Sequence, residues 1–172
     1  MENPVYAFIE IEKGSNIKYE LNKQTNTLEI DRMIPQPHVY PYSYGFIPNT
    51  LGEDGDELDI LIVSETPIAN NNTITAYIIG ALLMEDEQGK DDKILAVCDN
   101  DYFYNQKQNI TDLSSDELES IQTFFANYKL NEPGKWSKVH GFVDKTYANN
   151  IYQRSMQTTT RNDDPVHCPF YA

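Results

Sequence analysis

The sequence is short of cysteine and of positive charge, and each shortage narrows what the chain can be. Its two cysteines, Cys98 and Cys168, are too few for a disulfide framework. Thirteen basic residues against 27 acidic ones give a formal net charge of −14 at pH 7. That charge argues against nucleic acid or an anionic membrane surface as a partner, because both are themselves negative.

Long apolar runs and targeting signals are missing as well. No stretch approaches the roughly 18–20 apolar residues of a membrane span, and the first residues, Met-Glu-Asn-Pro-Val-Tyr, lack the basic and apolar regions of a signal peptide. No nucleophile–base motif of covalent catalysis stands out. We therefore expect a reduced, cytoplasmic protein.

Strand patterns fill the first hundred residues, and the length of 172 residues favours one domain over the whole chain, 1–172. Alternating or continuous apolar runs, bounded by turn residues, predict strands at 6–11, 17–21, 28–32, 60–63, 73–83 and 94–97. Residues 33–50, with four prolines and three tyrosines, are interpreted as a long ordered connection.

Helix signals come only late in the chain. Ser114 and Glu117 form a capping box ahead of an apolar face with helical spacing that ends before Pro133. A second helix is predicted for 144–156, and residues 157–172 are expected to be an irregular tail. Strands followed by helices predict an α+β protein, mainly β, whose strands can close a small barrel with two flanking C-terminal helices.

The stretch Asp54–Asp59 is the most unusual part of the sequence. It places Asp54, Asp56, Glu57 and Asp59 around Gly55, directly before the apolar run 60–63. Clustered carboxylates repel one another unless solvent, basic side chains or a divalent cation compensates them, and hard oxygen ligands suit Mg²⁺ or Mn²⁺. A solvated acidic loop is the plain alternative. An EF-hand is excluded, because Asp59 stands where that loop requires glycine.

Further acids and cations stand on the predicted strands and loops. Lys18 and Glu20 share one face of an alternating strand, where cross-strand ion pairs are the simplest explanation. Carboxylates that hold divalent cations beside lysine and arginine form the arrangement needed for a polyphosphate, with the cation lowering the pKa of a bound water. No Walker A or glycine-rich nucleotide loop occurs, so the phosphate compound need not be a nucleotide.

Seven short motifs in the same order make the chain similar to soluble family I inorganic pyrophosphatases of the bacterial type. They are Ile9–Ile11, Ile17–Glu20, Asp31-Arg32, Tyr40-Pro41-x-x-Tyr44-Gly45, Asp54–Ile60, the acidic stretch from Met84 to Lys93, and Tyr128-Lys129 before Gly134-Lys135-Trp136. The resemblance covers roughly residues 5–155. It implies a five-stranded OB-like closed barrel and Mg²⁺-dependent hydrolysis of pyrophosphate to two orthophosphates by a metal-activated water, without a covalent intermediate. Mn²⁺ or Zn²⁺ would be possible substitutes.

The resemblance also implies a role for each matching residue. It assigns metal binding to Asp54, Asp59, Asp86, Asp91 and Glu20, and the role of general base to Asp56. It assigns phosphate binding to Lys18, Arg32, Tyr44, Tyr128 and Lys129, with Glu10, Tyr40 and Lys93 supporting these groups from behind. Asp59 would bridge two cations, whereas Glu57 is expected to be solvated.

The resemblance implies a homo-oligomer as well, a hexamer in the bacterial family. Thr123 and Asn127 stand where many bacterial members carry histidine in subunit contacts, so the contacts of this chain are expected to differ. Three other functions stay open at this point: a binding module on an OB-like barrel, an Mg²⁺-dependent phosphatase for another ester, and an inactive homologue.

Overall fold

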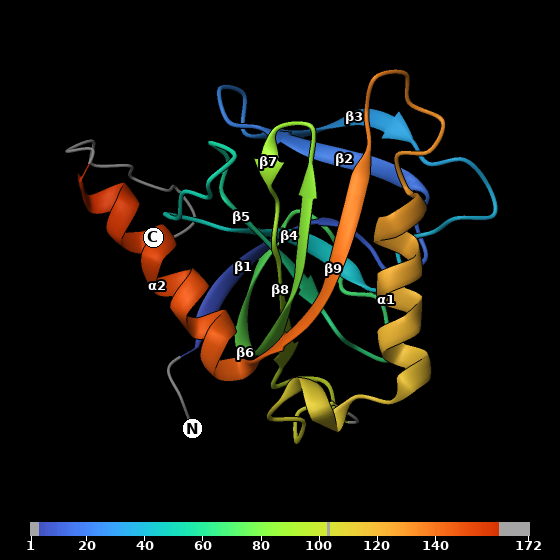
Figure 1. The fold of residues 1–172 in the computed structure, drawn as a ribbon. Coiled ribbons are helices and arrows are strands. Elements are labelled where there is room, and N and C mark those ends of the chain that lie inside the picture. Colours follow the sequence, from blue (N-terminus) through green and yellow to red (C-terminus); the bar gives the residue numbers. More distant parts are fainter. Residues whose placement is uncertain (1–3, 103, 162–172) are drawn as a thin grey trace.

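A computed structural model describes residues 4–102 and 104–161, and the side chains up to Met156. Figure 1 shows the strands gathered at the centre of the molecule, with the two long helices on opposite sides. In chain order the elements are β1 Val5–Ile11, β2 Ile17–Asn22, β3 Thr27–Met33, β4 Ser43–Ile47, β5 Leu58–Ile62, β6 Asn72–Asp86, β7 Gly89–Lys90, β8 Lys93–Cys98, the 3₁₀ turn η1 Ile110–Asp112, α1 Ser115–Asn127, β9 Ser137–Asp144 and α2 Lys145–Arg161.

Five strands close into a ring, which confirms the predicted mainly β, OB-like barrel with two helices. The pairing order is β1-β4-β5-β8-β6, and β1 also pairs with β6, so the sheet returns to its starting strand. The β5–β8 pair is parallel, whereas the other pairs of the ring are antiparallel. The parallel pair puts Asp59 level with Lys93. Closure leaves no ring strand with an unpaired edge.

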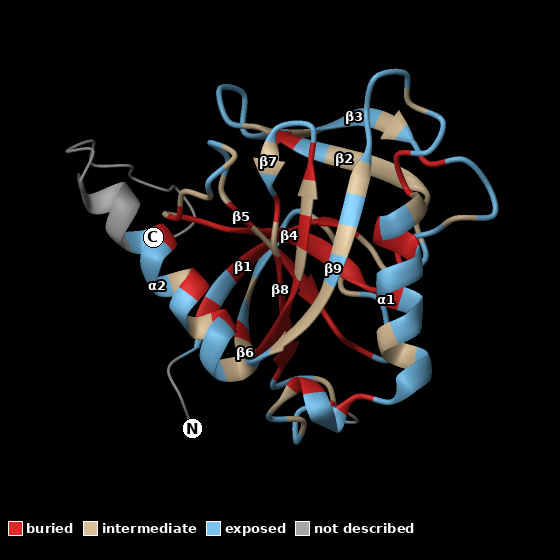
Figure 2. Cartoon of the chain, viewed as in Figure 1, coloured by how far each residue is buried: buried red, intermediate tan, exposed pale blue. Residues whose placement is uncertain are grey.

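The strands of the ring are largely buried on both faces (Figure 2), because alternate side chains join two apolar clusters. Along β5, Leu61 belongs to a cluster with Phe125 of α1, whereas Ile60 and Ile62 belong to a cluster with Ile151 of α2. The two helices therefore cover opposite faces of the same strands. This explains why the strand reads as a continuous apolar run.

Gly45 allows β1 and β4 to lie close together. A Cβ atom at this position would lie 1.7 Å from the backbone oxygen of Phe8. Ile9 is the residue level with Gly45 across the pair. Because the obstacle is backbone, no side-chain movement could relieve the clash.

The predicted face of the first helix is confirmed. Ser114 caps α1 through a reciprocal box with Glu117, and Ile121, Phe124 and Phe125 are buried against the strands. The β2–β3 hairpin forms a separate two-stranded sheet that lies across one end of the barrel (Figure 1). The hairpin covers the region where the start of β5, the end of β6 and the start of β8 lie together.

The main differences from the sequence-based expectation concern β4, β9 and α2, besides the short β7 and η1, which were not predicted. β4 lies inside the stretch 33–50, which was interpreted as a connection. The strand was not recognised because its buried Tyr, Gly and Phe lack the alternation that marks a half-exposed strand. β9 was not predicted at all: it has no fully buried residue and is held by pairing along β6. α2 continues to Arg161, five residues beyond the predicted Met156, while the rest of the predicted irregular tail, 162–172, lies outside the described residues.

Within residues 4–102 and 104–161, neither long helix combines the length and the apolar character required to cross a bilayer.

Candidate active site

A single polar cavity of about 460 Å³ brings together every site residue that the sequence predicted. This volume is within the range of small-molecule sites. The predicted residues that line it are Glu10, Lys18, Glu20, Arg32, Tyr40, Tyr44, Asp54, Asp56, Asp59, Asp86, Asp91, Lys93, Tyr128 and Lys129. They come from strands, loops and the end of α1, from across more than a hundred residues of chain.

The acidic loop is a tight turn that presents Asp56 to solvent. Gly55 has φ of +92°, a left-handed conformation that glycine adopts without strain. The Gly52 backbone N–H donates to the Asp56 carbonyl at 2.7 Å, and the Asp56 N–H donates to the Asp54 carboxylate at 3.1 Å. These bonds fix Asp54 toward its own loop and leave the Asp56 carboxylate exposed at the cavity.

Lys93 is a buried cation shared by two carboxylates. Its Nζ atom is 2.7 Å from Asp59 and 2.8 Å from Asp91, and the side chain is 1% exposed. Burial alone would lower the pKa of Lys93, but the carboxylate of Asp59 and the other groups around it raise the pKa well above its usual value. Burial raises the pKa of Asp91 to about 7, although Lys93 opposes that shift.

A second pair joins the end of β6 to Lys129, two residues beyond α1. Lys129 Nζ donates to Asp86 at 2.9 Å and lies 3.5 Å from Glu87. Burial works to raise the pKa of the Asp86 carboxyl, but the hydrogen bonds from Lys129 and the Gln88 backbone N–H and the charges of Lys129 and Lys93 together outweigh it, and the pKa is lowered. Asp86 is therefore held as a carboxylate and Lys129 as an ammonium.

The hairpin places two cations opposite each other over the cavity. Lys18 on β2 is level with Arg32 on β3, an arrangement that is unfavourable unless anions lie nearby. Asp31 lies 3.1 Å from Lys18, and Glu132 accepts a 2.8 Å hydrogen bond from Nη1 of Arg32. The Arg32 guanidinium also lies 5.8 Å from the ring centre of Tyr128, within cation–π range.

Glu10 and the tyrosines form the inner wall. The Glu10 carboxylate accepts a 2.8 Å hydrogen bond from the Leu21 backbone N–H. Burial raises the pKa of Glu10 to about 7. The Tyr40 and Tyr44 rings lie 5.4 Å apart, and the buried Tyr40 hydroxyl has no hydrogen-bond partner among the described residues.

The lining has the donor set that a hard divalent cation requires. Ten carboxylates (Glu10, Glu20, Asp31, Asp54, Asp56, Glu57, Asp59, Asp86, Glu87 and Asp91) face six cations (Lys18, Lys23, Arg32, Lys93, Lys129 and Lys135). The formal difference is therefore four negative charges. Oxygen-rich, negative surroundings of this kind suit Mg²⁺ or Mn²⁺.

No ready-made cation cage exists in the described part of the chain: no three Asp, Glu, His or Cys side chains there converge into one. The reason is visible in the ion pairs, since Asp59, Asp86 and Asp91 each point at a lysine ammonium. A divalent cation that binds these groups has to share them with lysine or displace it.

The sequence missed several lining residues. Glu57 was expected to be solvated, but it is half-buried and pairs with Lys23 of the hairpin turn. Glu87 accepts from the Trp136 backbone N–H at 3.2 Å as well as lying near Lys129. The position of Glu87 beside Asp86 was the only available signal, because its partners lie more than forty residues further along the chain.

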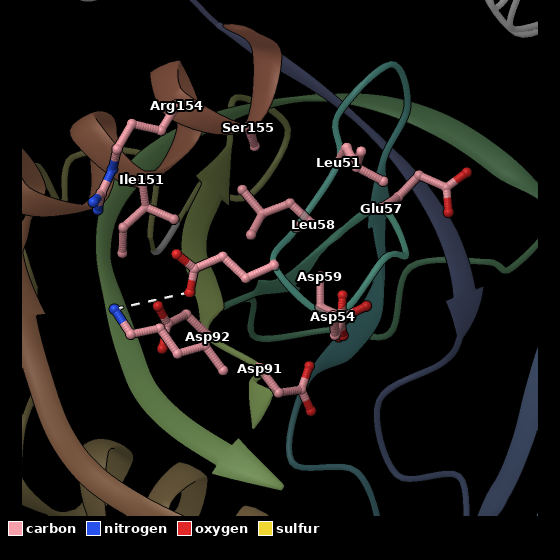
Figure 3. Close-up of a pocket in the computed structure, with 13 residues that line it drawn as sticks. Leu51, Asp54, Glu57, Leu58, Asp59, Asp91, Asp92, Ile151, Arg154 and Ser155 are labelled. Atoms are coloured by element: carbon pink, nitrogen blue, oxygen red, sulfur yellow. Dashed lines mark ion pairs between the residues drawn. The ribbon is translucent and has the colours of Figure 1, made fainter. Parts of the chain in front are cut away.

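A smaller cavity of about 260 Å³ adjoins the first one. Figure 3 shows Asp54, Asp59 and Asp91 at one end of it and Ile151, Arg154 and Ser155 of α2 at the other. The acidic loop thus separates the two cavities, and the smaller cavity, lined by both apolar and charged side chains, lies between this loop and α2. The Leu51 backbone N–H donates to the Ser155 carbonyl at 3.1 Å and ties the loop to the helix.

Known proteins resemble this chain over nearly its whole length. The sequence model of the inorganic pyrophosphatase family matches residues 7–160. The inorganic pyrophosphatase of Campylobacter jejuni is 43% identical over 157 residues, which are 90% of this chain and 91% of that protein. The structure of the Helicobacter pylori inorganic pyrophosphatase superposes with a TM-score of 0.89 at 40% identity and covers 92% of this chain and 94% of its own. The structure of the Thermus thermophilus inorganic pyrophosphatase gives a TM-score of 0.88 at 37% identity, with 92% of both chains covered.

Proposed function

We propose, from the premise that this chain belongs to the inorganic pyrophosphatase family, that its polar cavity is the active site and that hydrolysis there depends on Mg²⁺. The chain is an inorganic diphosphatase, and its substrate class is pyrophosphate. The residues, the metal and the route of the reaction are the parts that we propose.

The excess of carboxylates in the lining is the observation that carries the Mg²⁺ requirement. A cavity with four more negative than positive formal charges repels a polyanion unless cations accompany it. Asp54, Asp59, Asp86 and Asp91, with Glu20 at the rim, supply the oxygen ligands for such cations. Bound Mg²⁺ would neutralise phosphate charge and lower the pKa of a coordinated water.

The cations of the chain would hold the phosphates. Lys18 and Arg32 on the hairpin and Lys129 after α1 lie on different walls of the cavity, so two phosphoryl groups can be held from separate sides. Tyr44 and Tyr128 offer hydroxyl donors, and burial raises the pKa of both, so each keeps its proton at neutral pH. These contacts orient the P–O–P bridge.

Asp56 is the group we assign as general base. It lies on the cavity side of the acidic loop, and it forms no ion pair among the described residues, unlike Asp59, Asp86 and Asp91. A water oxygen attacks one phosphorus while its proton passes to Asp56, the bridging P–O bond breaks, and two orthophosphates leave. No side chain forms a bond to phosphorus.

Replacement of Asp56 separates this role from metal binding. In Asp56→Asn, kcat should fall by about 10²–10⁴-fold, the usual contribution of a general base, while the Mg²⁺ concentration for half-maximal activity stays within a few-fold. If turnover recovers at high Mg²⁺, Asp56 is a ligand and the assignment is wrong.

Asp59 should behave in the opposite way, because it is proposed to bridge two cations. Asp59→Asn should raise the Mg²⁺ requirement strongly, whereas Glu53→Gln in the same loop should not. Glu53 is exposed and lies outside the polar cavity, which makes it the matched control. Equal effects of the two substitutions on Mg²⁺ activation would refute a bridging role.

The setting of the enzyme is also a proposal: residues 1–172 form one domain, which works in the cytoplasm as a homo-oligomer, a hexamer by analogy. Thr123 and Asn127 lie on the outer part of α1, where the Asn127 side chain donates to the Thr123 carbonyl at 2.8 Å. Neither side chain gains charge near pH 6, so the assembly should not fall apart through these two positions as the pH drops from 7 to 5. Sedimentation velocity tests this, and a monomer at neutral pH would remove the premise.

A further inference from the structure

Glu132 holds the phosphate-binding arginine from outside the cavity. Arg32 lines the cavity, whereas Glu132 does not. The Nη1 atom of Arg32 donates to Glu132 at 2.8 Å, across a separation of 100 residues. Glu132 belongs to the segment between α1 and β9, and its carboxylate also lies 3.4 Å from Lys135, a second cation of the lining.

The contact with Glu132 uses one corner of the guanidinium and leaves the opposite edge without a hydrogen-bond partner among the described residues. The Nε and Nη2 atoms of Arg32 are buried and have no hydrogen-bond partner among the described residues. These two donors form one edge of the guanidinium plane and match two oxygens of one phosphoryl group. Unpaired buried donors are unfavourable, so the edge is best explained by a ligand that completes it.

The Tyr128 ring limits the guanidinium from a second direction. It lies 5.8 Å from the guanidinium carbon, in cation–π range, so Arg32 is restrained by a face contact as well as by Glu132. The side chain of Arg32 is only 12% exposed. Removal of Glu132 would leave the ring contact but release the rotation of the guanidinium in its own plane.

We infer that Glu132 is a positioning residue for substrate binding: it fixes Arg32 so that the Nε–Nη2 edge meets one phosphoryl group of pyrophosphate. The inference rests on the proposed function for the identity of the ligand. Glu132 acts through Arg32 and would touch neither the phosphate nor a bound metal ion. The alternative is that the Glu132 carboxylate occupies the position of the phosphate. It would then compete with the substrate, and its removal would strengthen substrate binding.

Steady-state kinetics with pyrophosphate and saturating Mg²⁺ separate these cases. Glu132→Ala should raise KM about 10-fold, the effect of one lost charge-assisted hydrogen bond, with a smaller change in kcat. Glu132→Gln retains an acceptor for Nη1 and should recover most of the loss. Glu119→Ala, at an exposed position of α1 away from the polar cavity, is the control and should match the wild type.

A double-mutant cycle tests whether Glu132 works through Arg32. In an Arg32→Ala background, the further change Glu132→Ala should alter KM less than twofold, because the group that it positions is gone. A lower KM in Glu132→Ala, an unchanged KM, or full additivity with Arg32→Ala would overturn the inference.

A binding readout keeps this result independent of the proposed function. Trp136 is the only tryptophan of the chain and follows Lys135 in the same segment, so its fluorescence can report the binding of methylenediphosphonate, a pyrophosphate analogue that cannot be hydrolysed, in saturating Mg²⁺. Weaker binding of the analogue by Glu132→Ala than by wild type is expected. If wild type binds the analogue but does not hydrolyse pyrophosphate, the proposed function fails and the inference about Glu132 stands. If wild type hydrolyses pyrophosphate and both readouts are unchanged in the variant, only the inference fails.

Discussion

Replacement of Glu10 by glutamine should make the metal-free protein more stable, and increasingly so as pH rises. Glu10 is 9% exposed, and burial raises its pKa from 4.5 to about 7. The folded state therefore binds a proton that the unfolded state has already released between these pH values. The contribution of this bound proton to the stability of the wild-type protein is fully present below pH 4.5 and is lost as the pH rises through 7.

The size of the effect follows from that difference in pKa. A change from 4.5 to about 7 corresponds to about 3 kcal/mol between the protonated and ionised forms. The glutamine amide in Glu10→Gln would keep an oxygen that accepts from the Leu21 backbone N–H, as the Glu10 carboxylate does at 2.8 Å, without the buried charge. For a chain of this length, about 3 kcal/mol corresponds to a rise in Tm of roughly 6–12 °C.

Thermal unfolding in EDTA, followed by circular dichroism at pH 4.5, 6 and 8, measures this difference. The advantage of Glu10→Gln over wild type should be small at pH 4.5 and should approach its full size at pH 8. Glu119→Gln, at an exposed position of α1, is the control and should track the wild type throughout. A difference between Glu10→Gln and wild type that does not change with pH would refute the reasoning.

Two further substitutions test the packing and the charge arrangement around the site. Gly45→Ala should lower the free energy of unfolding by more than about 3 kcal/mol, because its Cβ would lie 1.7 Å from the Phe8 backbone oxygen. Urea titration measures this loss. A near-neutral result would contradict the close approach of β1 and β4. Lys93→Met should cost about 3–5 kcal/mol in EDTA, because it leaves Asp59 and Asp91 without their shared cation. Mg²⁺ should raise the Tm of Lys93→Met more than that of wild type, since a divalent cation can take the place of the ammonium, and an equal rise in both proteins would argue against a cation site at these carboxylates.

The strands that carry the site could be predicted from sequence because their patterns are local. The alternation in residues 17–21 put Lys18 and Glu20 on one face, and the glycine-containing turn before the apolar run put Asp54 and Asp56 at a strand entrance. The cavity indeed contains all four. Periodicity and turn chemistry need no knowledge of distant contacts.

The parts that escaped prediction depend on partners far away in the chain. β9 has no fully buried residue, and its pairing with the long strand β6 holds it in place. Glu132 stands in a polar turn with no distinguishing pattern, and only the fold brings it to Arg32. Lys93 was assigned a supporting role by resemblance, yet its place between Asp59 and Asp91 follows from the parallel pairing of β5 with β8, which no local pattern encodes.

Phosphate release from pyrophosphate, with and without Mg²⁺, tests the central claim most directly. The excess of four carboxylates in the cavity predicts that purified protein in EDTA releases no phosphate above background and that added Mg²⁺ restores release. Asp59→Asn assayed alongside should need more Mg²⁺, and Glu53→Gln should respond as wild type does. Undiminished hydrolysis in excess chelator would contradict the account.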